Sequence, residues 1–549
     1  MRAPQSATAT ARHVAVIGAG MAGLRCSIVL ARSGMQVTLI EARDRVGGRI
    51  HQQRCGGHLV DMGPNWIHGT AGNPISAIAE KTNAVVVSPD EDGALFDSDG
   101  RRRPAEQANA LSAEIWALIA DAFKYSEEKG RQIGAGVSLF EYVRARVDGE
   151  LDLDGGGRDE AGIARRQKLN LDRADLLREV EKWGPFVGDP VQRQSLRFFW
   201  LEECIEGENV FVASTYRDIL AEVWQSALEE QQRGHLKVQL ETEVIHVELL
   251  SEGAQSEGGK VRITTAASEK QTFDDVVVTA PLGWLKRNKD NVFTPALPAR
   301  LSQAIDNINY GRLEKLYVTF PSAFWLGKDG GDTSSHPLFT QFHDPNYIEH
   351  PVSDGAWNQE IMSLAHLPGL TAQPTLLFYI YGPCASWIVA QVKDLTPHSD
   401  AYNAVLTAFA EPFYSRLPHY SPSTDEACRP SAFLMTQWQN DRFAGHGSYS
   451  NFQIGLEKGD EDIEVMRDSG GLGEAGGLWL AGEHTAPFVA LGTTTGAYWS
   501  GEAVAGRILA RYGVEKVEDE ETFEQYGQRK DVSGQKNGAD AANLNGLAV

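Results

Sequence analysis

The sequence predicts an α/β fold in which a discontinuous Rossmann-like domain carries an inserted α+β domain. Three observations support this prediction. Short apolar runs typical of buried parallel strands occur at residues 14–17, 276–279 and 478–481. The first run leads into a glycine-rich turn and a helical pattern. Helical or mixed patterns separate the runs, so one domain assembled from distant segments explains the chain better than domains arranged one after another.

The first strand–turn–helix–strand unit is the clearest element. A helix is predicted over residues 21–33 after the strand at 14–17, and Gly34 stands where a helix terminator belongs. A second buried strand follows at residues 37–40. This order is typical of the start of a parallel, helix-covered sheet.

The turn of this unit contains the pattern G-x-G-x-x-G, formed by Gly18, Gly20 and Gly23. The first glycine makes the turn, the second lets a pyrophosphate approach the backbone, and the third lets the helix pack on the strand. The helix N-terminus then offers N–H groups to the phosphates. Glu41 ends the second strand and is expected to bind ribose hydroxyls. A dinucleotide site is therefore predicted here, and a glycine-rich turn in another α/β fold is the alternative.

The middle of the chain changes pattern several times. Residues 73–222 are mostly helical, with a polar insertion at 148–159 that is predicted to be a mobile loop. Strands are predicted at 236–249 and 261–265. Residues 313–320 alternate between apolar and other residues as in a half-buried strand.

These patterns divide the chain into six segments. The segment after residue 515 is polar and lacks apolar periodicity, so it is predicted to be a disordered tail. The predicted boundaries are 1–72, 223–325 and 438–514 for the Rossmann-like domain, 73–222 and 326–437 for the inserted domain, and 515–549 for the tail.

Composition narrows the class of protein. The chain has 549 residues and a formal net charge of -23, which argues against nucleic-acid binding. An acidic surface either attracts a cationic small molecule or only confers solubility. The five cysteines are odd in number and scattered, so neither a disulfide framework nor a metal site is expected.

Targeting signals are not found in the sequence. The first thirteen residues contain no apolar signal region, and no run of about 18 apolar residues occurs. The last three residues are not a peroxisomal address. We therefore expect a cytoplasmic protein without a membrane span.

Several further motifs follow one another along nearly the whole chain. Together they resemble the flavin-containing amine oxidases, and polyamine oxidases most of all. The segments that carry the resemblance are residues 41–49, 61–69, 280–286, 311–320, 447–450, 481–485 and 496–501.

The resemblance implies an FAD-binding Rossmann-like domain with an inserted substrate-binding domain. Monoamine oxidases of this family attach FAD through a cysteine just before the Gly-Ser-Tyr motif, but residues 444–449 contain none, so non-covalent FAD is expected. The residues that match the family's FAD contacts, in addition to the glycines and Glu41, are Arg43, Gly48, Arg49, Val244, Trp438, Glu483 and Thr494.

The reaction that the resemblance implies is oxidation of a C–N bond with O2 as acceptor, giving hydrogen peroxide, an aldehyde and an amine. Lys315 matches the lysine that holds a water near the flavin and assists reoxidation, and an ordinary lysine on a strand is the alternative. His68 matches a histidine that accepts a hydrogen bond from the substrate amine or helps to keep it neutral, and a structural histidine is the alternative.

The resemblance also implies a substrate channel. Trp66 and Tyr449 are expected to wall it, although core packing explains Trp66 nearly as well. Glu202 and Glu203 match a helix that sends an acid to the channel, where it pairs with a distal ammonium, and solvated helix acids are the alternative. Thr493 stands where some relatives have an aromatic residue.

Three functional hypotheses remain. The first is a polyamine oxidase acting on spermine, spermidine or acetylated forms. The second is an oxidase of monoamines or L-amino acids, where Arg197 is a candidate for binding a carboxylate. The third is a non-catalytic flavin-binding scaffold, which the presence of Lys315 and His68 disfavours. The expected partners are a cationic amine and O2, and the oligomeric state is left open.

Overall fold

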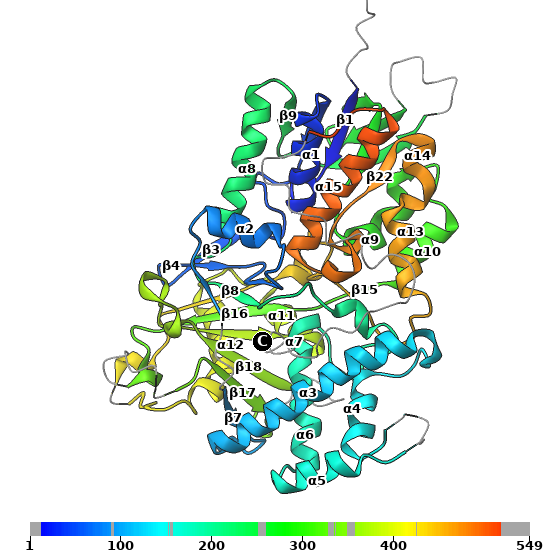
Figure 1. Ribbon diagram of the computed structural model, residues 1–549. Coiled ribbons are helices and arrows are strands. Elements are labelled where there is room, and N and C mark those ends of the chain that lie inside the picture. The colour runs from blue at the N-terminus through cyan, green and yellow to red at the C-terminus, as the bar shows by residue number, and fades with distance from the viewer. Residues whose placement is uncertain are drawn as a thin grey trace, which may run out of the picture.

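The computed structural model describes residues 12–88, 93–151, 153, 157–250, 260–327, 334, 336–348, 357–423 and 425–517. Part of the polar insertion at 148–159 and nearly all of the tail predicted from 515 lie outside these residues. The two domains of the architecture are each built around a main sheet, and Figure 1 shows these sheets at opposite ends of the molecule.

The first sheet is parallel, in the order β22-β13-β1-β2-β9. Its central strand β1 pairs Val14 with Val37 of β2 and with Asp275 of β13. Both faces are buried, because Val14 and Val16 enter one hydrophobic core while Ala15 enters another. The strands are β1 (His13–Ile17), β2 (Gln36–Ile40), β9 (Leu236–Gln239), β13 (Asp275–Val278) and β22 (Leu478–Leu480).

Helices cover this sheet from segments far apart in the sequence. In α1 (Met21–Arg32), every residue except Arg32 is buried. Figure 1 shows α1 beside α15 (Thr494–Arg511), and the two helices share one core with α8 (Arg217–Gln232). The helix α2 (Pro74–Lys81) contributes Ile75 and Ile78 to the same core. The fold therefore joins the beginning and the end of the chain, as the discontinuous domain requires.

A smaller four-stranded sheet and several helices complete this half. The sheet has the order β12-β11-β10-β14. Its strands and the neighbouring elements are β10 (Val244–Leu249), β11 (Val261–Thr265), β12 (Lys270–Phe273), β14 (Phe293–Thr294), α9 (Leu282–Val292), α10 (Ala299–Asn307), α13 (Gly459–Arg467) and α14 (Leu472–Gly476).

The second main sheet has six strands in the order β20-β16-β19-β18-β17-β7. It is mixed, because β7 joins β17 in parallel while the other pairs are antiparallel. The strands and the helices on one face are β7 (Gly93–Phe96), β16 (Glu314–Thr319), β17 (Phe339–His343), β18 (Asn358–Ser363), β19 (Thr375–Ile380), β20 (Ala432–Met435), α11 (Gly382–Val392) and α12 (Asp400–Tyr414).

One sequence prediction fails in this sheet. Residues 313–320 were expected to form a half-buried strand, but every residue of β16 is buried. The strand lies between β19 and β20, with Leu316 and Val318 in the core under α11 and α12 and Tyr317 in a separate core on the other face. The alternation of apolar and other residues along a strand indicates which face of the sheet each side chain lies on. Whether both faces are buried depends on the layers that cover the sheet.

A helical layer lies beside this sheet in Figure 1. It consists of α3 (Ala105–Lys129), α4 (Leu139–Val147), α5 (Glu160–Lys168), α6 (Arg173–Glu179) and α7 (Gly184–Val187). The shorter strands are β3 (Gln52–Cys55), β4 (His58–Asp61), β5 (Trp66–Ile67), β6 (Val86–Val87), β8 (Val210–Val212), β15 (Asn309–Tyr310) and β21 (Ser450–Asn451). In the described part of the chain, no helix has the length and apolar character to cross a bilayer.

Candidate active site

A cavity of about 360 Å³ lies between the two main sheets. Residues at the carboxyl ends of β1, β2 and β13 line one part of it, and residues of β16, β18 and β19 line another. The predicted site residues that line this cavity are Gly18, Gly20, Glu41, Arg43, Gly48, Arg49, Trp66, His68, Glu202, Val244, Lys315, Trp438, Tyr449, Glu483, Thr493 and Thr494.

The glycines form a cradle at the start of α1. Gly18 has a φ of +104°, and a Cβ on it would lie 2.5 Å from Thr279 Oγ1. Gly23 does not line the cavity; a Cβ there would lie 1.8 Å from the carbonyl oxygen of Gly18, so it permits close packing of helix and strand. Gly20 has open space at its Cα and caps α1 without a side-chain hydrogen bond, which leaves the helix N-terminus facing the cavity.

A second glycine pair completes this cradle. Gly47 donates its N–H to Ala19 O at 2.8 Å, and a Cβ on Gly48 would lie 3.3 Å from the Cα of Gly20. Glu41 lies beside it and accepts hydrogen bonds from Ala19 N at 2.7 Å and from Arg43 N at 2.9 Å. Bare backbone, a free helix N-terminus and a carboxylate fit the diphosphate and ribose of a dinucleotide.

Both arginines of the cavity wall have acidic partners. Arg43 forms two hydrogen bonds of 2.8 Å with the carboxylate of Asp441. Arg49 donates to Glu483 at 3.0 Å and to Ser448 O at 2.6 Å. The charge of Arg49 lowers the pKa of Glu483 against the opposing effect of burial, so Glu483 stays ionised. These pairs hold charged groups in place around the cradle.

Lys315 lies at the other side of the cavity, on β16. Its ammonium group donates to Gly63 O and to Asn65 Oδ1, and the side chain is buried. Burial lowers the pKa of Lys315 below its usual range, and the nearby carboxylate of Asp61 partly opposes this shift. Asp61 is itself buried and accepts hydrogen bonds from Tyr216 N and Gln52 Nε2. A lysine that loses its charge this easily can exchange protons near neutral pH.

His68 also lines the cavity. Burial lowers its pKa to about 4, although a hydrogen bond with Asn209 opposes the shift. The imidazole is therefore neutral at physiological pH and can accept a hydrogen bond at one ring nitrogen.

Aromatic and apolar side chains form the walls. Trp66 donates from Nε1 to Tyr379 Oη at 3.1 Å, and its ring packs edge-on against Phe211 at 5.2 Å. Tyr449 donates from its hydroxyl to Phe186 O at 2.6 Å. The ring of Phe186 stacks on Trp183, which also lines the cavity.

Two carboxyl groups line the same cavity, those of Glu202, which is partly buried, and Glu360, which is buried. Burial raises the pKa of Glu202 to about 8, and the charge of Glu483 adds to the shift. Burial also raises the pKa of Glu360, on β18, to about 7. Gln341 donates to Glu360, and Phe452 N donates to Glu202 at 3.2 Å. Both acids are poised to ionise when a cation approaches.

Two predicted residues lie elsewhere. Glu203 follows Glu202 after the short turn at Phe199–Glu202 and does not line the cavity, because consecutive side chains point in different directions. Arg197 is also outside the lining; it donates to Ile133 O at 2.6 Å and to Glu457 at 2.5 Å. The expectations that Glu203 reaches the channel and that Arg197 binds a carboxylate there are not supported by this geometry.

Sequence reasoning missed Asp61 and Glu360. Asp61 lies within the motif at residues 61–69 and ends β4 two positions before Gly63, which is the signal that the sequence offers. Glu360 lies in a strand without a motif and 45 positions after Lys315, so only the antiparallel ladder of β16, β19 and β18 brings it to the cavity.

Comparison with known proteins defines the class. The model of the family described as flavin containing amine oxidoreductase matches residues 21–509, and the chain belongs to that family. This family defines the chain as a flavin-containing amine oxidoreductase by class.

Individual relatives are distant. Flowering Locus D of Arabidopsis thaliana is 26% identical over 485 residues, which cover 86% of this chain and 52% of that protein. Polyamine oxidase 2 of the same plant is 24% identical over 528 residues, covering 91% of this chain and 89% of that protein. The chain thus spans about half the length of Flowering Locus D and most of Polyamine oxidase 2.

Among solved structures, wild-type putrescine oxidase bound to putrescine has a TM-score of 0.59 at 17% identity, covering 91% of this chain and 99% of that one. This likeness confirms the predicted two-domain α/β fold.

Proposed function

We propose that the chain is a polyamine oxidase, which oxidises a C–N bond of spermine, spermidine or their acetylated forms with O2 and non-covalent FAD. The observation that carries the proposal is a pair of carboxyl groups on the walls of a largely apolar cavity, those of Glu202, which is partly buried, and Glu360, which is buried. Besides hydrogen-bond donors, a partner of opposite charge stabilises the anionic form of an acid that is shielded from water. A substrate with several cationic nitrogens supplies such partners.

FAD supplies the two-electron chemistry of the C–N bond. The glycine cradle and the N-terminus of α1 would bind its pyrophosphate, and Glu41 its ribose. Among the described residues that line the cavity, the cysteine is Cys204, and burial raises the pKa of its thiol to about 12. A protonated thiol is a poor nucleophile, which supports non-covalent binding.

Two polar side chains, those of His68 and Lys315, would control the protonation of the substrate amine and the transfer of protons in the cavity. Neutral His68 would accept a hydrogen bond from the N–H of the reacting amine or, because it adds no negative charge, help to keep that amine neutral. Lys315 Nζ, held by Gly63 and Asn65, binds a water beside the reacting centre and takes or returns a proton through it. The aromatic walls of Trp66 and Tyr449 keep bulk water away.

The arginines argue against an amino-acid substrate. Among the described residues of the cavity wall, Arg43 and Arg49 carry guanidinium groups, and each already pairs with an acid. A substrate carboxylate would compete with Asp441 or Glu483 for them. A monoamine fits the apolar walls but supplies no second cation to pair with Glu202 or Glu360.

A substrate panel tests the proposal. Purified protein is examined for flavin absorbance, then for peroxide release with spermine, spermidine, their N-acetyl forms, a monoamine and several L-amino acids. We expect release that depends on polyamines. Turnover of monoamines or amino acids alone would overturn the polyamine assignment while keeping the family, and acid treatment that releases free FAD checks that the cofactor is not covalently attached.

A further inference from the structure

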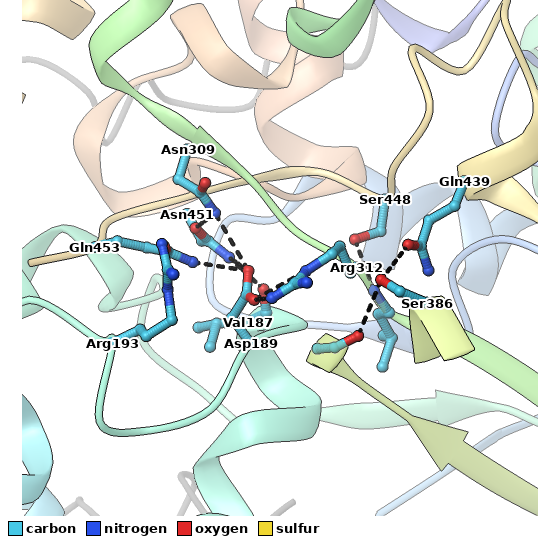
Figure 2. A network of polar contacts seen from close by, with 12 residues as sticks. Val187, Asp189, Arg193, Asn309, Arg312, Ser386, Gln439, Ser448, Asn451 and Gln453 are labelled. Carbon is cyan, nitrogen blue, oxygen red and sulfur yellow. Dashed lines mark hydrogen bonds and ion pairs between the residues drawn. The ribbon is translucent and has the colours of Figure 1, made fainter. Parts of the chain in front are cut away.

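A buried polar cluster outside the cavity joins three segments that are far apart in the sequence, and Figure 2 shows it from close by. At its centre is Asp189, whose side chain is 4% exposed. One carboxylate oxygen accepts from Nε and Nη2 of Arg312, the former at 3.1 Å. The other accepts from Gln453 Nε2 at 2.7 Å, Asn309 Nδ2 at 3.2 Å and Asn451 Nδ2 at 3.5 Å.

The cluster is tied to the cavity wall through the backbone. Phe186 and Val187, which directly precede Gly188 and Asp189, line the cavity. The carbonyl of Phe186 accepts from the Tyr449 hydroxyl at 2.6 Å, and that of Val187 accepts from Asn451 Nδ2 at 2.5 Å. Gly188, at a φ of +74°, accepts from Arg312 N at 3.0 Å. The carbonyls of two wall residues and of the neighbouring Gly188 are thus held by two other segments, which also contribute residues to the cavity wall.

Each of these segments reaches the cavity within a few residues of the cluster. Leu313 follows Arg312 and lines the cavity, and Lys315 lies two positions further on. Ser448, Tyr449 and Ser450 line the cavity directly before Asn451. Asp189 and Arg312 themselves do not line it.

Stability alone is a weak reason for such a cluster. A buried ion pair contributes little net free energy compared with apolar residues of similar volume, because desolvation offsets the attraction. What a carboxylate with several donors does supply is a unique geometry, since each donor must point at a fixed oxygen.

We propose that Asp189 is a positioning residue of the substrate cavity, which together with Arg312 holds Phe186 and Val187 in register with Tyr449 and the strand of Lys315, and so determines how long an amine the cavity accepts. This inference rests on the proposed oxidation of polyamines. It assigns to Asp189 no contact with substrate or flavin.

The test compares Asp189→Asn with a matched control, Asp462→Asn. Asp462 is equally buried and accepts hydrogen bonds from Arg300 and Asn307, but none of these residues lines the cavity. Asparagine at 189 keeps the shape and turns an amide donor toward the donors around it. We expect kcat/KM for spermine to fall up to about 100-fold, as for a misplaced wall. The effect should be mainly in KM and much smaller for a short monoamine, while Asp462→Asn lowers both substrates equally or not at all.

Two further measurements keep the test decisive. Arg312→Lys preserves the charge at a partly exposed position but loses the two-pronged contact, so it should fold and show an intermediate change in length preference. Hydrogen–deuterium exchange of the backbone at 184–189 should rise in Asp189→Asn and in Arg312→Lys, but not in the control. Equal KM changes for long and short amines in both Asp189→Asn and Asp462→Asn would overturn the inference. A wild-type enzyme that oxidises no polyamine would instead overturn the proposed function, and the exchange measurement would still decide the role of Asp189.

Discussion

Replacement of Glu202 by glutamine is the sharpest test of how the cavity recognises a cation. The amide keeps the shape and an oxygen that can accept from Phe452 N, now at 3.2 Å, but it cannot become an anion. A hydrogen bond to a charged group contributes roughly 1.5–3 kcal/mol. Since about 1.4 kcal/mol is tenfold in affinity, KM for a polyamine should rise about 10- to 150-fold. A monoamine of equal length should be affected far less.

The pH dependence adds a second signature. Because burial raises the pKa of Glu202 to about 8, this acid is protonated below that pH and ionised above it. The ratio of kcat/KM for a diamine to that for the matching monoamine should therefore increase from pH 6 to pH 9. This ratio cancels the deprotonation of the reacting amine, which both substrates share. In Glu202→Gln, only the increase near pH 7 that Glu360 supplies should remain.

The assay is peroxide release under steady-state conditions, with Glu203→Gln as the control. Glu203 is the next residue but does not line the cavity, so its replacement should leave the diamine ratio unchanged. If Glu202→Gln and Glu203→Gln behave alike, or if the wild-type ratio is flat with pH, Glu202 does not bind a substrate cation and the reasoning is refuted.

Three further outcomes are expected. Lys315→Met should slow the reoxidation of the reduced flavin by O2 about 100-fold or more. Stopped-flow absorbance should show little effect on the anaerobic reduction of the flavin by the amine. An unchanged rate of reoxidation would exclude Lys315 from this step. Gly23→Ala should prevent flavin binding or folding, because its Cβ would lie 1.8 Å from Gly18 O, and a fully loaded yellow variant would contradict this. Finally, Glu202→Gln should raise the Tm relative to wild type more at pH 8 than at pH 5. The reason is that an acid whose pKa is raised from 4.5 to about 8 by folding destabilises the folded state progressively across that pH range. A difference in Tm that does not depend on pH would show that folding does not raise the pKa of Glu202.

Local chemistry made the dinucleotide half predictable. The turn at Gly18 and Gly20, the following helix and Glu41 are set by backbone sterics and by neighbours within about thirty residues, so their order along the chain already defines their arrangement. The parallel strands were also predictable from local sequence, because a strand that is buried on both faces is a continuous apolar run.

The substrate half depended on contacts that no local pattern records. Whether β16 is half-buried or fully buried depends on α11, α12 and the opposite core, which come from other parts of the chain. Glu360 also depends on distant contacts, because it reaches the cavity only through strand pairing. The five nitrogen atoms that donate hydrogen bonds to Asp189 belong to residues more than a hundred positions away. The motifs of the sequence, through their resemblance to a known family, already pointed to the flavin class and to the catalytic candidates. Which acids line the cavity was decided only by tertiary packing, because the direction of a side chain depends on every layer around it.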